Sequence, residues 1–227
     1  MDNKYKLTDE TIEFNGVKLY RIEALRDFGY VKKGDTGGFV QSEKNLSQFE
    51  NCWICDDAKA YGDSFVAENA VLLDFAQICD HAIATGYSRI YNRAFVHQRA
   101  MIRGRAIICN GASVGGNAAV VGEAKVIEFS KVEGSSIVNG HAEISDAIIR
   151  RSSDYMVFQN WWSSLRHFTW TRSNNMWKVG CFYGTGKELI EKAYKDSELS
   201  GREYKRVVEY VESILRDENQ NKVIINL

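Results

Sequence analysis

Hydrophobic and small residues recur every six positions from residue 54 to residue 148. Every sixth position from Ala58 to Ala142 holds Ala or Ser. A second, mostly aliphatic series lies two positions after each of these, from Ala60 to Ile144, and Ile54 precedes it. Gly, Asn or Asp follows two positions later at most repeats. A period of six excludes an α-helix, and so long a repeat without an insertion predicts a solenoid.

Each repeat is predicted to form one short strand and one corner. The small and the aliphatic residue lie two apart, so both side chains point to one side of a strand, which we expect to be the interior. Gly, Asn and Asp tolerate the positive φ of a tight corner. Three sides would close a triangular coil of eighteen residues, and the repeat then contains about five coils.

The chain before the repeat has the pattern of a small cap. Asn15-Gly16 separates two segments of alternating character, and this dipeptide is a strong signal for a β-hairpin. A solenoid leaves an open strand edge at each end, and that edge needs cover. We therefore predict that residues 1–50 form an N-terminal hairpin cap and lead into the solenoid, which occupies residues 51–149.

The chain after the repeat changes character twice. Four of the five tryptophans lie in residues 150–227, where aromatic-rich segments predict strands that pack against the solenoid or form a platform for ligand stacking. Helical periodicity begins at Thr185 and predicts two helices. Capping-box spacing is present at Thr185 with Glu188 and at Ser200 with Glu203. Residues 223–227 are predicted to form an edge strand.

Several short motifs resemble the hexapeptide-repeat family of left-handed parallel β-helix proteins, including acyltransferase-like proteins of enterobacteria and phages. The resemblance covers roughly residues 20–148, and the C-terminal segment resembles tails of phage-encoded β-helix proteins. It implies left-handed winding, which the spacing alone does not determine, and assembly into trimers. The expected fold is therefore mainly β, a left-handed β-helix with a hairpin cap and an α+β tail. The motifs are Asp27-Phe28, Val31-Lys32-Lys33-Gly34, Gly37-Gly38-Phe39, Asn45-Leu46-Ser47 and Cys52-Trp53-Ile54.

Composition and charge argue against several classes of protein. The formal net charge is −1, so the chain has no overall basic bias toward nucleic acid. No apolar run reaches the length of a membrane span, and the first residues do not resemble a signal peptide. Five cysteines, an odd number in a chain of this size, favour a reducing compartment, and we expect a cytoplasmic location.

The outward positions of the repeat predict three faces of different character. Residues eighteen apart stack in columns, and two of the three faces are largely apolar, more than a lone monomer exposes to water. We expect one of them to pack against other copies of the chain and the other against the C-terminal segment. The sequence does not assign the two roles. The candidate interface residues are Phe65, Ile83, Met101, Val121 and Ile137.

A stretch without acidic residues crosses the middle coils. Between His81 and Gly122 the chain contains no Asp or Glu. The arginines of this stretch predict a basic belt that binds phosphate, a nucleotide or an acidic partner surface. A solvated rim balanced by acidic neighbours is the alternative. The arginines are Arg89, Arg93, Arg99, Arg103 and Arg105.

One pair of residues on the polar face has the chemistry of a catalytic site. Cys79 and His97 lie eighteen residues apart in one column, where a thiol and an imidazole could act as nucleophile and base. Gly115 leaves room above His97. An ordinary surface ladder is the alternative, and no catalytic motif of the resembled acyltransferases matches any of the four histidines.

Two further motifs carry no functional prediction. Cys52 and Cys55 have the spacing of a metal or redox pair, but Cys52 occupies an inward position and Cys55 an outward one, so no metal site is predicted. Residues 184–187, Gly-Thr-Gly-Lys, contain only part of a phosphate loop, and the start of a helix explains them.

Three classes of function fit these patterns. We favour an oligomeric binding protein of phage or prophage type, without a cofactor, that engages an anionic nucleotide or a host protein, for example as an inhibitor of host defence or by sequestering a nucleotide signal. A CoA-dependent acyltransferase with acetyl-CoA as donor is the first alternative. The repeat lacks the extruded loop that such enzymes usually carry near the site, which makes catalysis the weaker expectation. A structural part of a virion is the second alternative.

Overall fold

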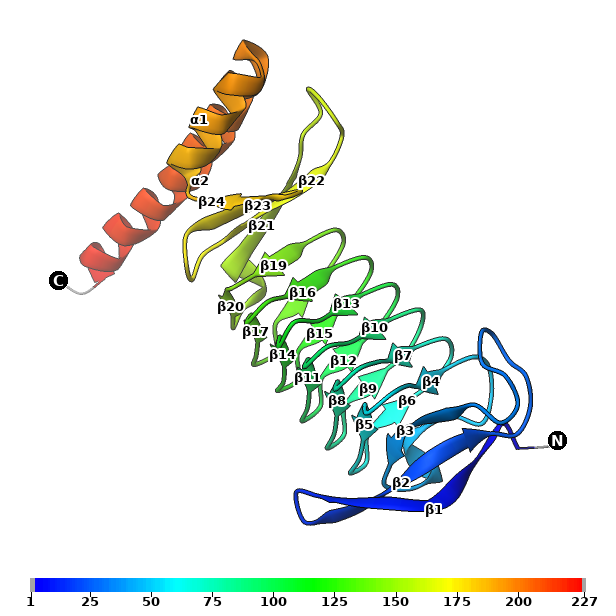
Figure 1. The fold of residues 1–227 in the computed structure, drawn as a ribbon. Coiled ribbons are helices and arrows are strands. Elements are labelled where there is room, and N and C mark those ends of the chain that lie inside the picture. Colours follow the sequence, from blue (N-terminus) through cyan, green and yellow to red (C-terminus); the bar gives the residue numbers. More distant parts are fainter. Residues whose placement is uncertain (1–2, 226–227) are drawn as a thin grey trace. The chain divides into compact units, whose positions relative to one another are not determined.

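The chain divides into two compact units. The computed structural model describes residues 3–225, without the side chains of residue 219 and residues 221–225. The first unit extends to Met156 and holds the N-terminal hairpin and the solenoid (Figure 1). The second begins at Val157 and holds most of a small antiparallel sheet and two helices.

Three sheets of parallel strands form the sides of the solenoid (Figure 1). The face that carries His97, here the His97 face, consists of β3 (Thr36–Val40), β5 (Lys59–Ala60), β8 (Gln77–Ile78), β11 (Phe95–Val96), β14 (Ser113–Val114), β17 (Lys131–Val132) and β20 (Ile148–Ile149). The Phe65 face consists of β6 (Phe65–Val66), β9 (Ile83–Ala84), β12 (Met101–Ile102), β15 (Ala119–Val120) and β18 (Ile137–Val138). The Arg89 face consists of β4 (Trp53–Ile54), β7 (Val71–Leu72), β10 (Arg89–Ile90), β13 (Ile107–Ile108), β16 (Lys125–Ile127) and β19 (Glu143–Ser145).

The register between coils is eighteen residues, as predicted, from β4 to β19, and it shortens to seventeen at the last pair, β17 with β20. Phe95, for example, pairs with Gln77 on one side and with Ser113 on the other. Both inward series are buried, and Ala94 and Val96 are 0% exposed. These observations confirm the parallel solenoid and its small-plus-aliphatic interior. Its left-handed winding stays a prediction from the resemblance.

The corners adopt the backbone conformation that their residues predict. Each predicted Gly, Asn or Asp corner has a positive φ, as at Asp74 (58°) and Gly104 (72°). Glu68, Gln98 and Glu128 also have positive φ, although their residue types did not indicate it. Corner side chains bond to the next coil: Glu68 Oε2 accepts from the Gly86 backbone N–H at 2.8 Å. Such bonds help to offset the strain of a non-glycine residue in this conformation.

The solenoid has about six coils and begins one coil earlier than the prediction of five. Val40 of β3 pairs with Ala60, and Leu46 forms a parallel bridge with Val66; both separations are twenty residues. The two extra residues lie before Ile54. From Ile54 onward, paired residues on adjacent coils are eighteen apart until the last pair, as for Ile54 with Leu72. The two extra residues interrupt the six-residue period, so the first coil cannot be recognised from the sequence pattern.

The N-terminal hairpin caps the first edge, as predicted. β1 (Tyr5–Phe14) and β2 (Val17–Ala24) are antiparallel and turn at Asn15-Gly16, both with positive φ. β2 then pairs with β3 and so extends the sheet of the His97 face. The buried Lys4 ties this cap to the first coil, because its Nζ donates to the backbone oxygens of Phe49 at 3.1 Å and Cys52 at 2.9 Å.

Side chains substitute for a further coil at the other end of the Phe65 face. The backbone N–H of Ile137 donates to Ser152 Oγ at 3.0 Å, and that of Asn139 donates to Tyr155 Oη at 3.1 Å. The Tyr155 hydroxyl in turn donates to the Ile137 backbone oxygen at 3.2 Å. Short 3₁₀ helices lie near the two ends of the solenoid, η1 (Glu43–Asn45) and η2 (Ser152–Asp154).

The C-terminal strands and helices were predicted, with two errors in detail. The Thr185–Glu188 capping box is confirmed, because Glu188 Oε2 accepts from the Thr185 N–H at 2.8 Å. The box at Ser200 is wrong: the second helix begins at Glu198, and the Ser200 N–H donates to Ser197 Oγ instead. This helix includes residues 223–225, so the predicted strand is wrong there, and residues 226 and 227 lie outside the description. The elements are β21 (Tyr155–Gln159), β22 (His167–Thr171), β23 (Met176–Val179), β24 (Phe182–Gly184), α1 (Gly186–Asp196) and α2 (Glu198–Ile225).

The aromatic residues of the second unit build a core of their own. Trp170 and Trp177 are 0% and 2% exposed, and the Phe168 ring lies 6.0 Å from that of Trp177 and 5.1 Å from that of Tyr204. The predicted packing of this segment on an outer face of the solenoid stays a prediction. Within residues 3–225, no helix combines the length and the apolar character that a membrane crossing requires.

Candidate functional site

The imidazole of His97 is held in a defined position on the His97 face. It lies one residue after β11, and its ring stacks on Phe95 with centroids 4.6 Å apart and planes 16° apart. Nε2 lies 3.2 Å from Ser113 Oγ on the next coil. A Cβ on Gly115 would lie 2.3 Å from the ring, so the absence of a side chain there is what leaves room for the imidazole.

Partial burial keeps this imidazole neutral. Removal of the ring from water lowers the pKa of His97 below its ordinary value of 6.5, and the carboxylates of Asp80 and Glu133 oppose the change. A neutral imidazole has a lone pair with which to accept a proton at neutral pH. The ring therefore has the protonation state of a general base.

Cys79 occupies the same column as His97, one coil earlier, but its thiol has a different partner. Burial raises the pKa of Cys79 to about 11; a hydrogen bond with the Tyr61 hydroxyl opposes this change, and Asp80 adds to it. In the described chain no hydrogen bond joins the Cys79 sulfur to the His97 ring. The register brings the two predicted residues together, but the thiol is protonated at neutral pH and is a poor nucleophile.

The five arginines are distributed around the solenoid rather than gathered in one site. Arg89 and Arg105 line a hollow on the Arg89 face together with Tyr87 and Ile107. The other three occupy different places. Arg93 lies in a hollow at the following corner, Arg99 follows at the corner after His97, and Arg103 lies 3.9 Å from the sulfur of Met101. Within residues 3–225 none of the five forms an ion pair, and the Asp74 carboxylate lines the hollows that hold Arg89 and Arg93.

The hollow at Arg89 continues into a second one on the same face. The two share Arg89 and Ile107, and the second is also lined by Tyr30 and Tyr91. Sequence reasoning missed Tyr30, which comes from the segment before the repeat and has no place in the count of six. Tyr87 could have been found, because it lies eighteen residues before Arg105.

The remaining sequence candidates have separate structural roles. Cys52 Sγ accepts from Lys4 Nζ at 3.2 Å, and Cys55 Sγ lies 3.4 Å from the Tyr30 hydroxyl, so the two thiols contact different partners. His81 is an exposed corner residue, 3.5 Å from an Asp63 carboxylate oxygen. Within residues 3–225 no three His, Cys, Asp or Glu side chains are grouped so that they could hold a metal ion.

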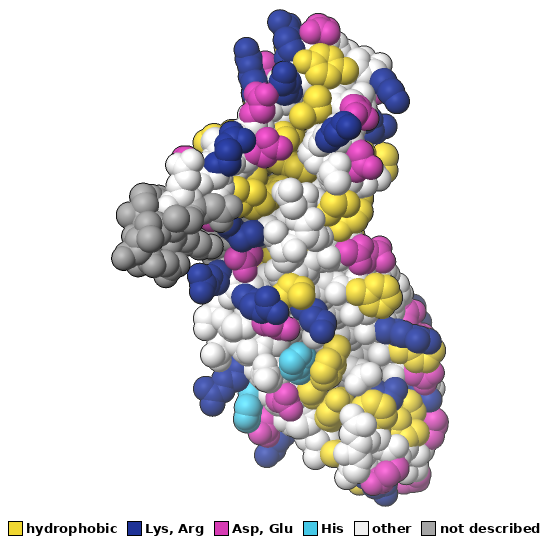
Figure 2. Space-filling model, turned by 90° about the vertical axis from the view of Figure 1, so that its left-hand side faces the viewer, with side chains coloured by type: hydrophobic (Ala, Val, Ile, Leu, Met, Phe, Trp, Pro, Cys, Tyr) yellow, Lys and Arg dark blue, Asp and Glu magenta, His cyan; other side chains and the backbone are white. Residues whose placement is uncertain are grey.

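Four of the five predicted interface residues lie in one outward column on the Phe65 face. Phe65 and Ile137 are 38% and 45% exposed. Ile83 and Met101 lie between them on β9 and β12 and are half-buried, and Val121 follows β15. Hydrophobic side chains also reach the surface among charged ones of both signs on the side drawn in Figure 2. Assembly through this column stays a prediction.

Comparison with known proteins gives one informative similarity. The chain is 32% identical over 91 residues to a protein of Escherichia coli (strain K12) described as the uncharacterized acetyltransferase YdcK. The match covers 36% of this chain and 28% of the E. coli protein, so it spans little more than a quarter of that relative's length. No protein-family model matches the sequence. The six-residue repeat, the parallel coils and this similarity together fit the hexapeptide-repeat β-helix family.

Proposed function

We propose that the chain is an acyltransferase that takes an acyl group from a CoA thioester and uses His97 as its base. The observation that carries the proposal is the half-buried, neutral imidazole, held by Phe95 and Ser113 on an open face of the coil. The similarity to a protein described as an acetyltransferase favours this function over the phage-type binding protein expected from the sequence. It also makes acetyl-CoA the first donor to test.

The proposed reaction requires one proton acceptor near neutral pH. When Ser113 Oγ accepts from the Nε2–H of His97, the lone pair of the ring lies on Nδ1. An amine or hydroxyl acceptor would attack the thioester carbonyl carbon while His97 Nδ1 takes its proton. The carbon–sulfur bond then breaks, and the imidazolium returns the proton to the leaving thiolate.

Two arginines flank the proposed base and suit the donor's phosphates. Arg93 lies at the corner before β11 and Arg99 at the corner after His97, and neither guanidinium is paired with a carboxylate in the described chain. Guanidinium groups bind phosphate oxygens through two parallel hydrogen bonds. We expect these two side chains to hold the anionic part of the donor.

The test measures thiol release from acetyl-CoA in the presence of amine and hydroxyl acceptors. We expect His97→Gln to lower kcat/KM by about a hundredfold or more, the usual contribution of a general base. His81→Gln is the matched control, because it removes an exposed imidazole at a neighbouring corner, and it should retain full activity. Absence of transfer to every acceptor, together with no stabilisation by acetyl-CoA, would refute the proposal.

Binding of an anion without catalysis is a second candidate function. It is favoured by the hollow in which Arg89 and Arg105 meet with no carboxylate partner in the described chain. We expect thermal stabilisation by a nucleotide from a panel that includes ATP and cyclic dinucleotides. Combined Arg89→Gln and Arg105→Gln substitutions should abolish this stabilisation, while Arg103→Gln, outside the hollow, should leave it unchanged. Stabilisation by acetyl-CoA alone would contradict this alternative.

A further inference from the structure

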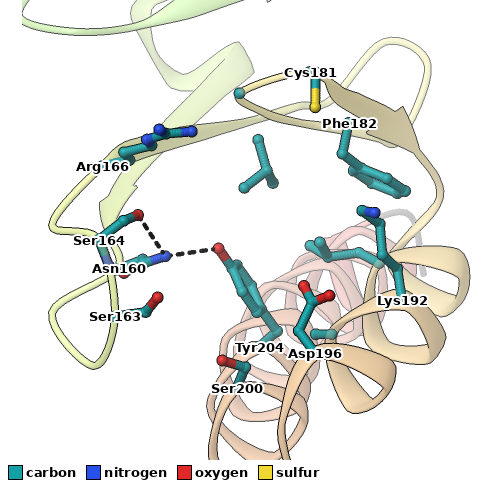
Figure 3. Close-up of a pocket in the computed structure, with 14 residues that line it drawn as sticks. Asn160, Ser163, Ser164, Arg166, Cys181, Phe182, Lys192, Asp196, Ser200 and Tyr204 are labelled. Carbon is teal, nitrogen blue, oxygen red and sulfur yellow. Dashed lines mark hydrogen bonds between the residues drawn. The ribbon is translucent and has the colours of Figure 1, made fainter.

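A hollow of about 200 Å³ lies within the second unit (Figure 3). Its walls come from the segment between β21 and β22, the turn between β23 and β24, and the facing sides of α1 and α2. The proposed acyl transfer on the solenoid makes no use of it. The hollow combines buried hydrogen-bonding groups, unpaired charges of both signs and an apolar wall.

Two buried polar residues define one side of the hollow. Asn160 and Tyr204 are 5% and 7% exposed. Asn160 Oδ1 accepts from the Ser164 backbone N–H at 2.9 Å. Its Nδ2 donates to Ser164 Oγ at 3.3 Å and to Tyr204 Oη at 3.1 Å (Figure 3). In the described chain the Tyr204 hydroxyl thus accepts a hydrogen bond and finds no acceptor for its own proton. The hydroxyl is therefore able to donate to a molecule bound in the hollow that it lines.

Three charged side chains line the same hollow. Arg166 and Lys192 are cationic and Asp196 is anionic, and within residues 3–225 none of the three takes part in an ion pair. Arg166 lies on the opposite side of the hollow from the other two, which both come from α1 (Figure 3). Burial raises the pKa of Tyr204; the hydrogen bond with Asn160 opposes this change, and the Asp196 charge adds to it.

The remaining wall is apolar. Val179 contributes from the end of β23 and Phe182 from the start of β24, and the buried Leu189 contributes from α1. Such a wall suits a short run of methylene groups, since it removes apolar surface from water without needing a polar partner. The ligand should therefore have a short aliphatic body with charged groups at its ends.

We propose that this hollow binds a small acidic amino acid, with two carboxylates and one ammonium group. The two cations and one anion of the hollow would then be neutralised by the complementary set on the ligand. Asp196 takes the ammonium group, and Lys192, on the same helix, takes the carboxylate beside it. Arg166, on the opposite side, takes the side-chain carboxylate, and the Tyr204 hydroxyl donates to a ligand oxygen. The short carbon chain of the ligand packs on Val179 and Leu189.

The test is calorimetric titration of the full chain with L-glutamate, glutarate and L-glutamine. L-glutamate should bind saturably. Glutarate lacks the ammonium group and L-glutamine lacks one carboxylate, and each should bind about tenfold more weakly, the usual loss for one charge-assisted hydrogen bond. No saturable binding of any of the three would overturn the proposal, and so would glutarate binding as tightly as L-glutamate.

Substitutions assign the charges one at a time. Asp196→Asn should weaken L-glutamate binding about tenfold and leave glutarate binding unchanged, because only L-glutamate carries the ammonium group. Arg166→Gln should weaken L-glutamate but not L-glutamine, because only L-glutamate carries the side-chain carboxylate. Lys195→Gln, exposed on α1 and outside the hollow, should change neither. All three positions are exposed, so folding should be retained. An L-glutamate affinity unaffected by Asp196→Asn would overturn the proposal.

The proposal is independent of acyl transfer on the solenoid. A His97→Gln protein should bind L-glutamate as tightly as the wild type, and a chain without transferase activity should still bind it. Conversely, Arg166→Gln should weaken the binding of L-glutamate and leave the binding of acetyl-CoA unchanged.

Discussion

At the residue scale, the repeat determines which residues meet, and local burial determines what they can do. The eighteen-residue period places Ser113 and Gly115 on the coil next to His97, and both contacts could be predicted from the sequence. The protonation of the ring could not be predicted, because it depends on how much of the ring the Phe95 stack and the adjacent coils remove from water. The same limit applies to Cys79, whose column was predicted but whose burial was not.

The lowered pKa of His97 predicts a pH dependence of stability. Below pH 6.5 the unfolded imidazole binds a proton, whereas the folded one stays neutral until its lower pKa is reached. Its contribution to the free energy of unfolding is therefore complete above pH 6.5 and is lost as the pH falls from that value through the folded pKa. The stability advantage of the wild type over His97→Gln should shrink between pH 8 and pH 5.

Urea unfolding of both proteins across this pH range checks the prediction. Taking the difference between wild type and variant removes the titration of the carboxylates that both share. A difference that stays constant with pH, or one that grows as the pH falls, would show that the folded imidazole is not held neutral by burial.

At the element scale, the solenoid could be predicted wherever the six-residue period is regular. The coil at which this period is interrupted was missed. The separation between paired residues is twenty across the first coil, seventeen at the last pair, Lys131 with Ile148, and eighteen between them. The backbone absorbs these changes at corners, where one or two residues do not alter the strand pairing. The hollow of the second unit could not be predicted, because Arg166 and Asp196 lie in segments with no common period.

A side chain at a glycine corner has two costs in stability: strain of the backbone at positive φ, and a clash with the next coil. Two glycines of the solenoid allow these costs to be measured separately. Gly104 and Gly140 occupy one corner column, with φ of 72° and 63°. A Cβ at Gly104 would lie 2.9 Å from the backbone oxygen of Gly122, whereas one at Gly140 would meet nothing within 4 Å. Gly140→Ala should therefore cost only the backbone strain, about 1–2 kcal/mol. Gly104→Ala should cost clearly more, since the next coil must also shift.

Urea denaturation of the two alanine variants against the wild type measures both costs, and Asn117→Ala at an exposed corner serves as the control that should change little. Equal destabilisation by Gly104→Ala and Gly140→Ala would mean that the coils separate freely at this corner. The stacking distance between coils would then not limit the choice of residue.

At the scale of the whole molecule, the outer surface of the solenoid has two features that a single chain leaves unsatisfied. One is the group of five arginines, none of which has a carboxylate partner within residues 3–225. The other is the apolar column on the Phe65 face, from Phe65 at 38% exposure to Ile137 at 45%. Exposed apolar columns of this length usually mark a protein interface, and a regular flat strand face suits a second copy of the same chain. The resemblance adds the expectation of a trimer.

Met101 lies at the centre of this column, on β12 between Ile83 and Ala119. Met101→Glu would place a charge in the middle of the expected interface, where desolvation makes it costly. We expect the wild type to show the mass of a trimer by size exclusion with light scattering, and Met101→Glu to shift it to the monomer. Lys131→Glu, an exposed position on the His97 face, should keep the trimer. A monomeric wild type would refute the interface, and a Met101→Glu trimer would move it to another face of the solenoid.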